Sequence, residues 1–213
     1  LKGSAGQSLG AFLSKSIKIK LFGDANDYVA KGLSGGKIVV VPSKDNNFKS
    51  NENTIIGNTV LYGATSGKLF AAGKAGERFA VRNSGAISVI EGCDANGCEY
   101  MTGGEVYILG RVGDNFAAGM TGGMAFVFDP DNIFENYVNS ASVIWQKPET
   151  KYWKERLKTV LQEYNLETQS EISKKILQNF SEEVANFKQV CPIEMLNKLQ
   201  NPITLKKNIL ETG

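Results

Sequence analysis

A short internal repeat constrains this chain more than any other feature. Five segments each combine a short apolar piece, a turn of small residues and an apolar strand. One glycine of each turn aligns across the five segments, at Gly36, Gly67, Gly85, Gly104 and Gly123. The spacings are 31, 18, 19 and 19 residues, and the first is one period plus a polar stretch over 42–53 that we expect to be a surface loop. A fixed repeat of this kind indicates a stacked architecture.

The length of the repeat predicts one coil of a parallel β-helix, because 18 to 19 residues are too few for a pair of helices. The apolar strands are rich in β-branched and aromatic residues, as in 38–41 and 125–128. A single coil cannot bury its apolar face, so stacked coils bury it between neighbours. The segment 17–22 is interpreted as an earlier coil. We therefore predict a mainly β chain whose residues 1–129 form a right-handed parallel β-helix.

Glycines are expected at the turns for a conformational reason. Each turn requires either a positive φ or a close approach between backbones, and glycine allows both because it has no Cβ. We predict a structural rather than a chemical role for Gly32, Gly35, Gly36, Gly63, Gly67, Gly85, Gly103, Gly104, Gly119, Gly122 and Gly123.

The second part of the chain has a different composition, since 22 of the 23 glycines lie at or before position 123. We expect residues 130–213 to form a helical extension that packs on the β-helix or caps its open end. Thr168 followed by Glu171 is interpreted as a capping box, and Pro192 as the first residue of a last helix. The apolar stripes of the three expected helices are Trp153, Leu157, Val160, Leu161 and Tyr164, then Ile172, Ile176, Leu177 and Phe180, then Met195, Leu196 and Leu199.

The chain contains no histidine, which excludes Ser-His-Asp and Cys-His catalysis and every metal site that needs histidine. The net charge of +2 gives no argument for binding to nucleic acid or to an anionic membrane. No apolar run is long enough for a membrane span. We expect reduced cysteines and a cytoplasmic location. The chain begins at Leu1, with neither an initiator Met nor a signal peptide, so we expect a piece of a longer protein.

Three patterns invite a chemical interpretation and do not support one. The segments 32–37 and 63–68 resemble phosphate-binding loops, but they have the wrong glycine spacing and precede expected strands. Cys98 lacks a base, and we expect the neighbouring Glu99 to raise the pKa of its thiol. Turn geometry and solvation account for the carboxylates Asp24, Asp27, Glu77, Glu91, Asp94 and Asp114. We predict no catalytic, cofactor-binding or metal-binding residues.

Four stretches carry a resemblance to a known family. The runs 3–12, 23–40, 97–104 and 115–129 are similar in order to the C-terminal glycine-repeat (GXGXG) domain of the glutamate synthase large subunit. The helical part resembles the end of that domain, most clearly over 161–180. One departure is the sequence Asp94-Ala-Asn96, where a histidine is expected in many relatives.

This resemblance implies a division of labour. Glutamate synthase, an oxidoreductase, makes glutamate from glutamine and 2-oxoglutarate. An amidotransferase domain releases ammonia, and a second domain with FMN and an iron–sulfur cluster uses it. The resemblance implies that the present chain is a non-catalytic scaffold joining these domains of the same polypeptide, with a small reductase subunit as a further partner. The cofactors would then be bound by the other domains.

Two other interpretations remain open at this point. The chain is also compatible with a related β-helix subunit of another complex, such as formylmethanofuran dehydrogenase or a stand-alone glutamate synthase-like subunit. A third hypothesis is an independent hydrolase or lyase that uses the groove of the β-helix. The sequence upstream of Leu1 would distinguish the first two.

Overall fold

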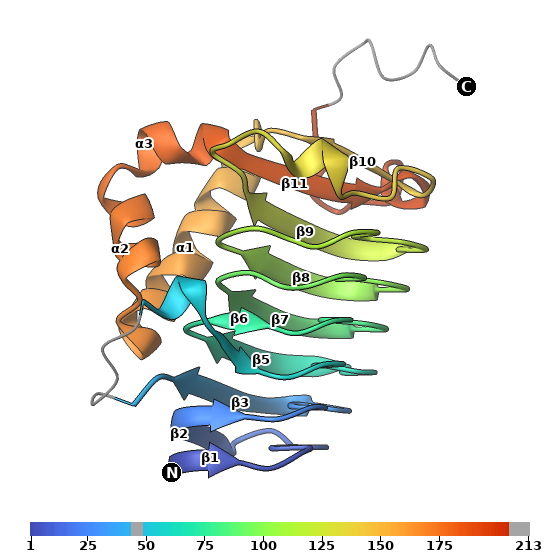
Figure 1. Ribbon diagram of the computed structural model, residues 1–213. Coiled ribbons are helices and arrows are strands. Elements are labelled where there is room, and N and C mark those ends of the chain that lie inside the picture. The colour runs from blue at the N-terminus through green and yellow to red at the C-terminus, as the bar shows by residue number, and fades with distance from the viewer. Residues whose placement is uncertain (44–48, 205–213) are drawn as a thin grey trace.

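The structure, a computed structural model, describes residues 1–43 and 49–204. In these residues the main element is a nine-stranded sheet with the order β1-β2-β3-β5-β7-β8-β9-β11-β10. The parallel strands come one from each successive coil and stack upward from the N-terminus (Figure 1). They are β1 (Lys2–Ala5), β2 (Lys18–Ala25), β3 (Ser34–Val41), β5 (Ser66–Ala71), β7 (Ser84–Ile90), β8 (Thr102–Ile108) and β9 (Gly122–Phe128). The predicted parallel β-helix is confirmed.

A second, smaller sheet follows the polar insertion. It pairs β4 (Thr54–Ile56) in parallel with β6 (Lys74–Ala75). Of the loop predicted over 42–53, residues 44–48 lie outside the described part of the chain. Ser50–Glu52 form a 3-10 turn with no buried residue, which fits the expected surface location.

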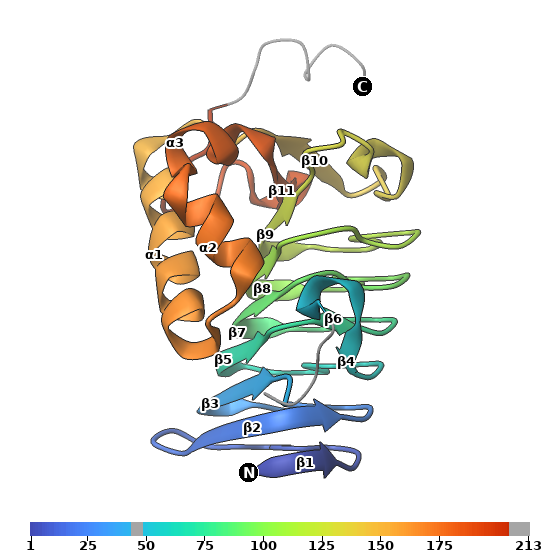
Figure 2. The ribbon, with the colours of Figure 1, turned by 60° about the vertical axis from the view of Figure 1, so that its left-hand side comes forward.

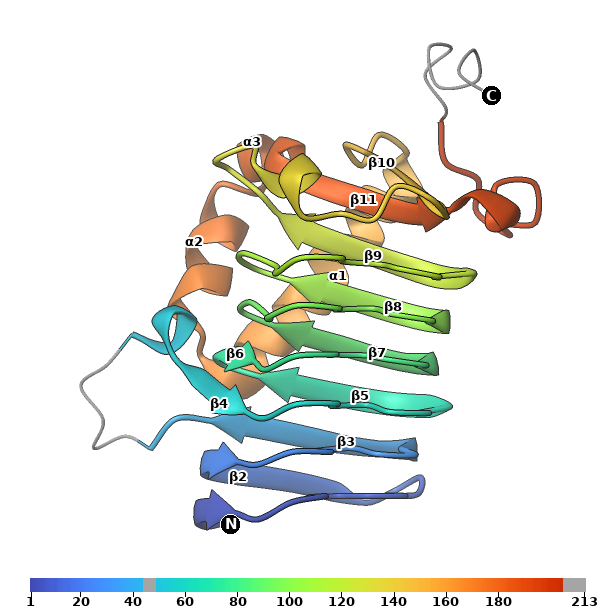
Figure 3. The ribbon, with the colours of Figure 1, turned by 45° about the vertical axis from the view of Figure 1, so that its right-hand side comes forward.

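From β3 to β9 the main sheet is largely buried on both faces, which is typical of parallel sheets. Alternate residues point to opposite sides, so Ile38 and Val40 belong to the core inside the coils, whereas Val39 and Val41 belong to an outer core. Like residues stack between coils, as Ile38 does on Leu69. Figure 3 shows α1 behind the sheet and the connecting segments of the coils in front of it.

Helices cover the outer face of the sheet beside the stack (Figure 2). They are α1 (Lys151–Thr168), α2 (Glu171–Gln178) and α3 (Phe180–Glu183). The side chain of Thr150 caps α1 by accepting a hydrogen bond from the backbone N–H of Trp153 at 3.4 Å. The buried stripe of α1 is the predicted one: Trp153, Leu157, Val160, Leu161 and Tyr164.

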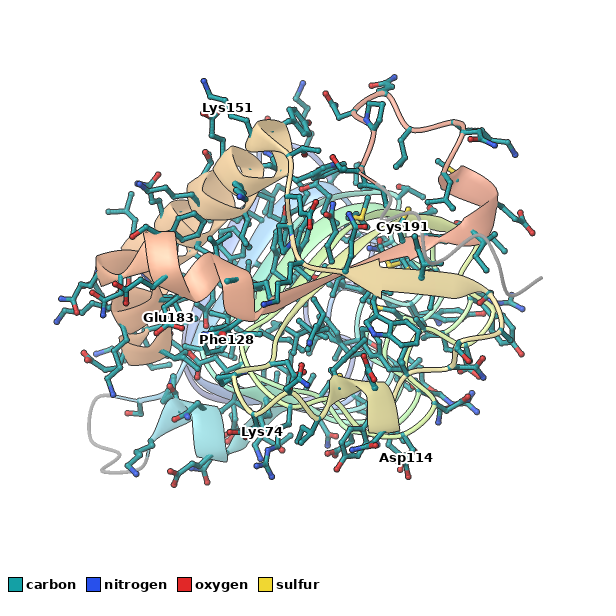
Figure 4. The ribbon with its side chains drawn as sticks, turned by 90° about the horizontal axis from the view of Figure 1, so that it is seen from above. Lys74, Asp114, Phe128, Lys151, Glu183 and Cys191 are labelled. Atoms are coloured by element: carbon teal, nitrogen blue, oxygen red, sulfur yellow. The ribbon has the colours of Figure 1, made fainter. Side chains whose placement is uncertain are left out.

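Two antiparallel strands complete the sheet after β9. Strand β11 (Phe187–Pro192) pairs with β9, and β10 (Val143–Gln146) pairs with β11. Figure 4 looks along the stack and shows both strands crossing its end, with Cys191 labelled on β11. The sequence predicts a helical extension over these residues, and the two strands correct that prediction. The sheet is thus continuous across residue 129, where the composition changes. Three further 3-10 turns, Phe134–Asn136, Val184–Asn186 and Ile193–Met195, lie between these elements.

Two predicted helix starts are wrong. Thr168 is the last residue of α1, where its hydroxyl donates to the carbonyl of Tyr164, and the residue that caps α2 is Ser170. Pro192 ends strand β11 and is followed by the short 3-10 turn Ile193–Met195. Pro192 lies beyond the residues of β11 that pair with β9. Its missing N–H therefore removes no hydrogen bond between these two strands.

Candidate functional site: the stacked turns and the helix-docking face

One wall of the β-helix is built from turns instead of strands. It comprises the six segments 8–12, 28–32, 59–63, 78–82, 96–100 and 115–119, which we call the turn wall. In every segment the first, third and fifth residues have a positive φ, between 52° and 64°. Most of these residues are not glycine, and they include Phe12, Tyr28 and Tyr100.

The alternating backbone of the turn wall lets each coil bond to both of its neighbours. The N–H groups of Arg78 and Arg82 donate to Ala95 and Glu99 in the following coil, at 2.9 and 3.0 Å. The N–H group of Ala80 points the opposite way and donates to Val60 in the preceding coil at 2.9 Å. Left-handed residues other than glycine cost energy, and these ladder hydrogen bonds offset that cost.

Seven of the predicted turn glycines have a φ in the left-handed region. Gly104 has a φ of +84°, and a Cβ built on it would lie 2.4 Å from the carbonyl oxygen of Ala86. Gly63 has a φ of +64° and open space around it. The seven are Gly32, Gly35, Gly63, Gly67, Gly104, Gly119 and Gly123.

The other four predicted glycines have ordinary φ values but no room for a side chain. A Cβ on Gly85 would lie 2.0 Å from the carbonyl oxygen of Thr65, in the coil below. The distance to a carbonyl oxygen is likewise 2.0 Å for Gly122 and 2.3 Å for Gly103, whereas a Cβ on Gly36 would lie 2.6 Å from Cδ2 of the Leu13 side chain. At these positions the close approach of neighbouring coils accounts for glycine.

A column of three lysines on the outer face of the main sheet meets two carboxylates of α1. Strand register places Lys18 beside Lys37, and Lys37 beside Lys68. Glu163 accepts hydrogen bonds from Lys37 and Lys68 at 2.8 and 2.6 Å. Glu167 accepts from Lys18 and Lys37 at 2.8 and 3.2 Å. This network joins the C-terminal half of α1 to three coils.

Towards the N-terminal end of α1 the charges are reversed, with the cation on the helix and the carboxylate on the sheet. There Arg156 donates to Glu105 at 2.8 Å. Glu105 stands in the same register column as Lys68, with Ile87 between them. A reversed α1 would bring like charges together, so the column fixes the direction in which this helix docks.

Sequence reasoning did not identify this lysine column, although its signal is present. Gly36 and Gly67 align in the repeat, and each is followed by a lysine, Lys37 or Lys68. Because aligned residues of a stacked repeat lie one above the other, the alignment predicts that these lysines are neighbours. A concentration of positive charge on one column then requires anionic partners.

The pKa values of both α1 carboxyls are lowered. Burial raises the pKa of Glu163, but the hydrogen bonds from Lys37 and Lys68 outweigh it and hold the net value below the ordinary 4.5. Burial likewise raises the pKa of Glu167, and the hydrogen bonds from Lys18 and Lys37 outweigh it.

Acid is therefore expected to weaken the docking of α1. A carboxyl with a lowered folded-state pKa stabilises the fold fully above its unfolded value of 4.5. That contribution, roughly 1 to 2 kcal/mol for the network, is lost as the pH falls through the lowered pKa. Urea unfolding measured from pH 7 to pH 3 should show this loss, and the double variant Glu163→Gln, Glu167→Gln should show less of it. The exposed pair of Glu52 with Lys49 is the control, and an unaltered acid profile in the double variant would contradict this expectation.

A buried carboxylate holds the corner between α1 and α2. Glu91 is 1% exposed, and its Oε1 accepts hydrogen bonds from the hydroxyls of Tyr164 and Ser170 at 3.0 and 2.5 Å. Ser170 also caps α2 by accepting from the N–H of Ser173. The expectation that solvation accounts for Glu91 is wrong, because α1 and α2 cover it. Burial and the charge of Glu91 raise the pKa of Tyr164 well above its ordinary value.

All three cysteines are buried and free. Burial raises the pKa of the Cys93 and Cys191 thiols to about 12. The pKa of Cys98 is also well above its ordinary value, because of burial first and of nearby Cys93 second. The predicted cause, Glu99, is not among these causes. A thiol held protonated in this way is a poor nucleophile.

The remaining motifs have structural explanations. The two segments that resemble phosphate-binding loops lead into β3 and β5, so no helix N-terminus follows them. Asp27 accepts a hydrogen bond from the N–H of Asn58 in the next coil, which is turn chemistry as expected. Among the described residues, no cluster of three or more His, Cys, Asp or Glu side chains is placed to hold a metal ion. Nor does any described helix have the length and apolar character of a membrane span.

Comparisons with known proteins agree with this architecture. The chain is 61% identical to the glutamate synthase [NADPH] large chain of Azospirillum brasilense over 98% of its length. It is 51% identical to the ferredoxin-dependent glutamate synthase of Antithamnion sp. over 89% of its length. It is 47% identical to the glutamate synthase [NADH] of Schizosaccharomyces pombe over 96% of its length. The chain spans only 14%, 12% and 10% of these three relatives.

The family comparison covers most of the described residues. The family described as "GXGXG motif" matches residues 1–193, which includes the whole turn wall, the main sheet and all three helices. Together with the relatives, this match indicates the GXGXG region of a glutamate synthase large chain. The chain belongs to the GXGXG motif family.

Proposed function

We propose that this chain is a non-catalytic scaffold of glutamate synthase, which holds an amidotransferase domain and an FMN domain of the same polypeptide in position for ammonia transfer. The observation that carries this proposal is that packing between coils explains the glycines marked out by the sequence. Each of them either adopts a left-handed φ or touches the neighbouring coil. A rigid stack of this kind holds attached sites at a fixed separation better than loops do.

The relatives supply a second argument. Their names specify three different electron donors, NADPH, ferredoxin and NADH, yet each matches this chain over 89% or more of its length. A region that selected the electron donor would be expected to differ among them. The relatives also favour a role in glutamate synthase over one in a different complex.

The proposal predicts that the chain produced by itself does no chemistry. Its thiols are held protonated by burial, and it has no histidine to act as a base. We expect the purified chain to be colourless, to retain no flavin or iron, and to release no ammonia from glutamine. Absorbance spectra, metal analysis and an ammonia assay measure this directly. A yellow protein, or one that hydrolyses glutamine, would overturn the non-catalytic role.

A further inference from the structure

The outer surface of the turn wall carries most of the exposed aromatic rings of the molecule. Among the described residues, four of the five exposed aromatic side chains lie on it, and the fifth, Tyr152, lies on α1. The helices cover the other side of the stack (Figure 3), and β11 and β10 cross its end. The four rings and their exposed fractions are Phe12 68%, Tyr28 38%, Tyr62 36% and Tyr100 52%.

Two of these rings occupy positions where glycine is the less strained choice. Phe12 and Tyr100 have a φ of 58° and 52°, at the fifth position of their turn segments. Three other coils have glycine at this position, Gly32, Gly63 and Gly119. A bulky residue in the left-handed region is unusual and strained. Glycine would form the same turn without that strain, so the turn itself does not require an aromatic residue at these positions.

Each of these two rings has one covered and one free face. The ring of Phe12 lies against Gly32 in the next coil, where an added Cβ would be 2.5 Å from its Cδ1. The ring of Tyr100 lies against Gly119 in the same way, at 2.6 Å. More than half of each side chain remains in solvent. Apolar rings held rigidly by one face are the kind of group that anchors a protein interface.

The charges of the turn wall indicate what kind of surface it fits. Its cations are Lys31, Arg78 and Arg82, and its one described carboxylate is Glu99. Glu99 is 3.8 Å from Arg78, and Lys31 lies 5.8 Å from the centre of the Tyr28 ring. Arg82 is exposed and forms no ion pair with any described residue. Carboxylates border the wall where its segments begin, at Asp27, Glu77 and Asp114. Where the segments end, at Lys31 and Arg82, the wall is basic as well as aromatic, and this edge complements an acidic surface with apolar recesses.

We propose that the turn wall packs against another part of the same polypeptide, one whose surface is acidic and has recesses for the rings of Phe12, Tyr62 and Tyr100. This inference rests on the proposed function, since it names the face through which the scaffold acts. The relatives have at least 86% of their length outside the matched region, which supplies ample surface for such a contact. Tethering favours this occupant, because a linked partner has a high effective concentration.

Hydroxyl-radical footprinting of the complete large chain tests the contact. The oxidation rates of Tyr62 and Tyr100 are compared with those of the same tyrosines in the unfolded protein. If no partner covers the wall, the exposed fractions of 36% for Tyr62 and 52% for Tyr100 predict that oxidation is only modestly slower than in the unfolded protein. A covering partner excludes water, so we expect slowing of about tenfold or more. Oxidation of Tyr100 at about half its unfolded rate would show an uncovered wall and overturn the proposal.

Dilution distinguishes a partner within the same polypeptide from a second copy of the protein. Protection by the same polypeptide is independent of protein concentration, whereas protection that disappears on dilution would show a second copy on the wall and overturn the proposal. The variants Arg82→Glu and Tyr62→Glu should restore oxidation of Tyr100, and Tyr152→Glu on α1, the charge-matched control for Tyr62→Glu, should not. None of these footprinting measurements depends on enzyme activity. If the wall is protected in the parent and Arg82→Glu exposes it without changing the coupling of the two half-reactions, the proposed function is contradicted and the docking surface is left intact.

Discussion

Replacing Gly104 by valine is expected to lower the free energy of unfolding by about 4 kcal/mol, several times the effect of a typical substitution. The backbone of Gly104 has a φ of +84°, which strains a β-branched residue, and the new Cβ would lie 2.4 Å from the carbonyl oxygen of Ala86. Strain of this type costs about 1 to 3 kcal/mol, and overpacking adds a similar amount. Urea unfolding of the parent chain and the variant measures the difference.

Two control variants separate the conformational cost from the steric cost. Gly63→Ala changes a left-handed residue in open space, so only the conformational cost remains, about 1 kcal/mol. Gly85→Ala changes a residue with an ordinary φ whose Cβ would lie 2.0 Å from a carbonyl oxygen, so only the steric cost remains. We expect Gly104→Val to be the most harmful and Gly63→Ala the least. If Gly104→Val unfolds at the same urea concentration as the parent, the alignment of the coils is wrong.

Glycine spacing was sufficient to predict the stack because stacking forces the coils into register. Gly67, Gly85, Gly104 and Gly123 recur at the coil length, and the strands that begin around them pair in parallel as expected. The buried stripe of α1 was equally visible, since a helix on a flat sheet needs one continuous apolar face. These features depend on contacts between residues at regular spacing.

The features that sequence reasoning missed depend on contacts between distant segments. Nothing near Phe12 or Tyr100 signals a positive φ, because hydrogen bonds to neighbouring coils impose it. The sequence of β11 predicts part of a helical region, since an apolar run ending in a proline also fits a helix start. The sequence near Glu91 predicts a solvated carboxylate, because its partners Tyr164 and Ser170 are 73 and 79 residues further along the chain.

Substitutions on the turn wall are expected to separate the two half-reactions of the complete enzyme. In the proposed function, ammonia released from glutamine reaches the FMN domain before it escapes to water. A wall that no longer docks would misplace the two domains, and small misplacements of reacting groups cost rate steeply. Arg82→Glu should therefore raise the amount of glutamine consumed per 2-oxoglutarate consumed by roughly twofold or more. Neither half-reaction should be abolished, because the proposed function assigns no catalytic residue to the wall.

The ratio of glutamine consumed to 2-oxoglutarate consumed, measured on the complete large chain, is the most direct test of the scaffold role. Tyr62→Glu and Arg82→Glu are compared with Tyr152→Glu, which adds the same charge as Tyr62→Glu at a tyrosine of similar exposure on α1. The scaffold account predicts a ratio of one in the parent and in Tyr152→Glu, and a raised ratio in both wall variants. A ratio that stays at one in the wall variants, while footprinting shows that they have exposed the turn wall, would contradict it.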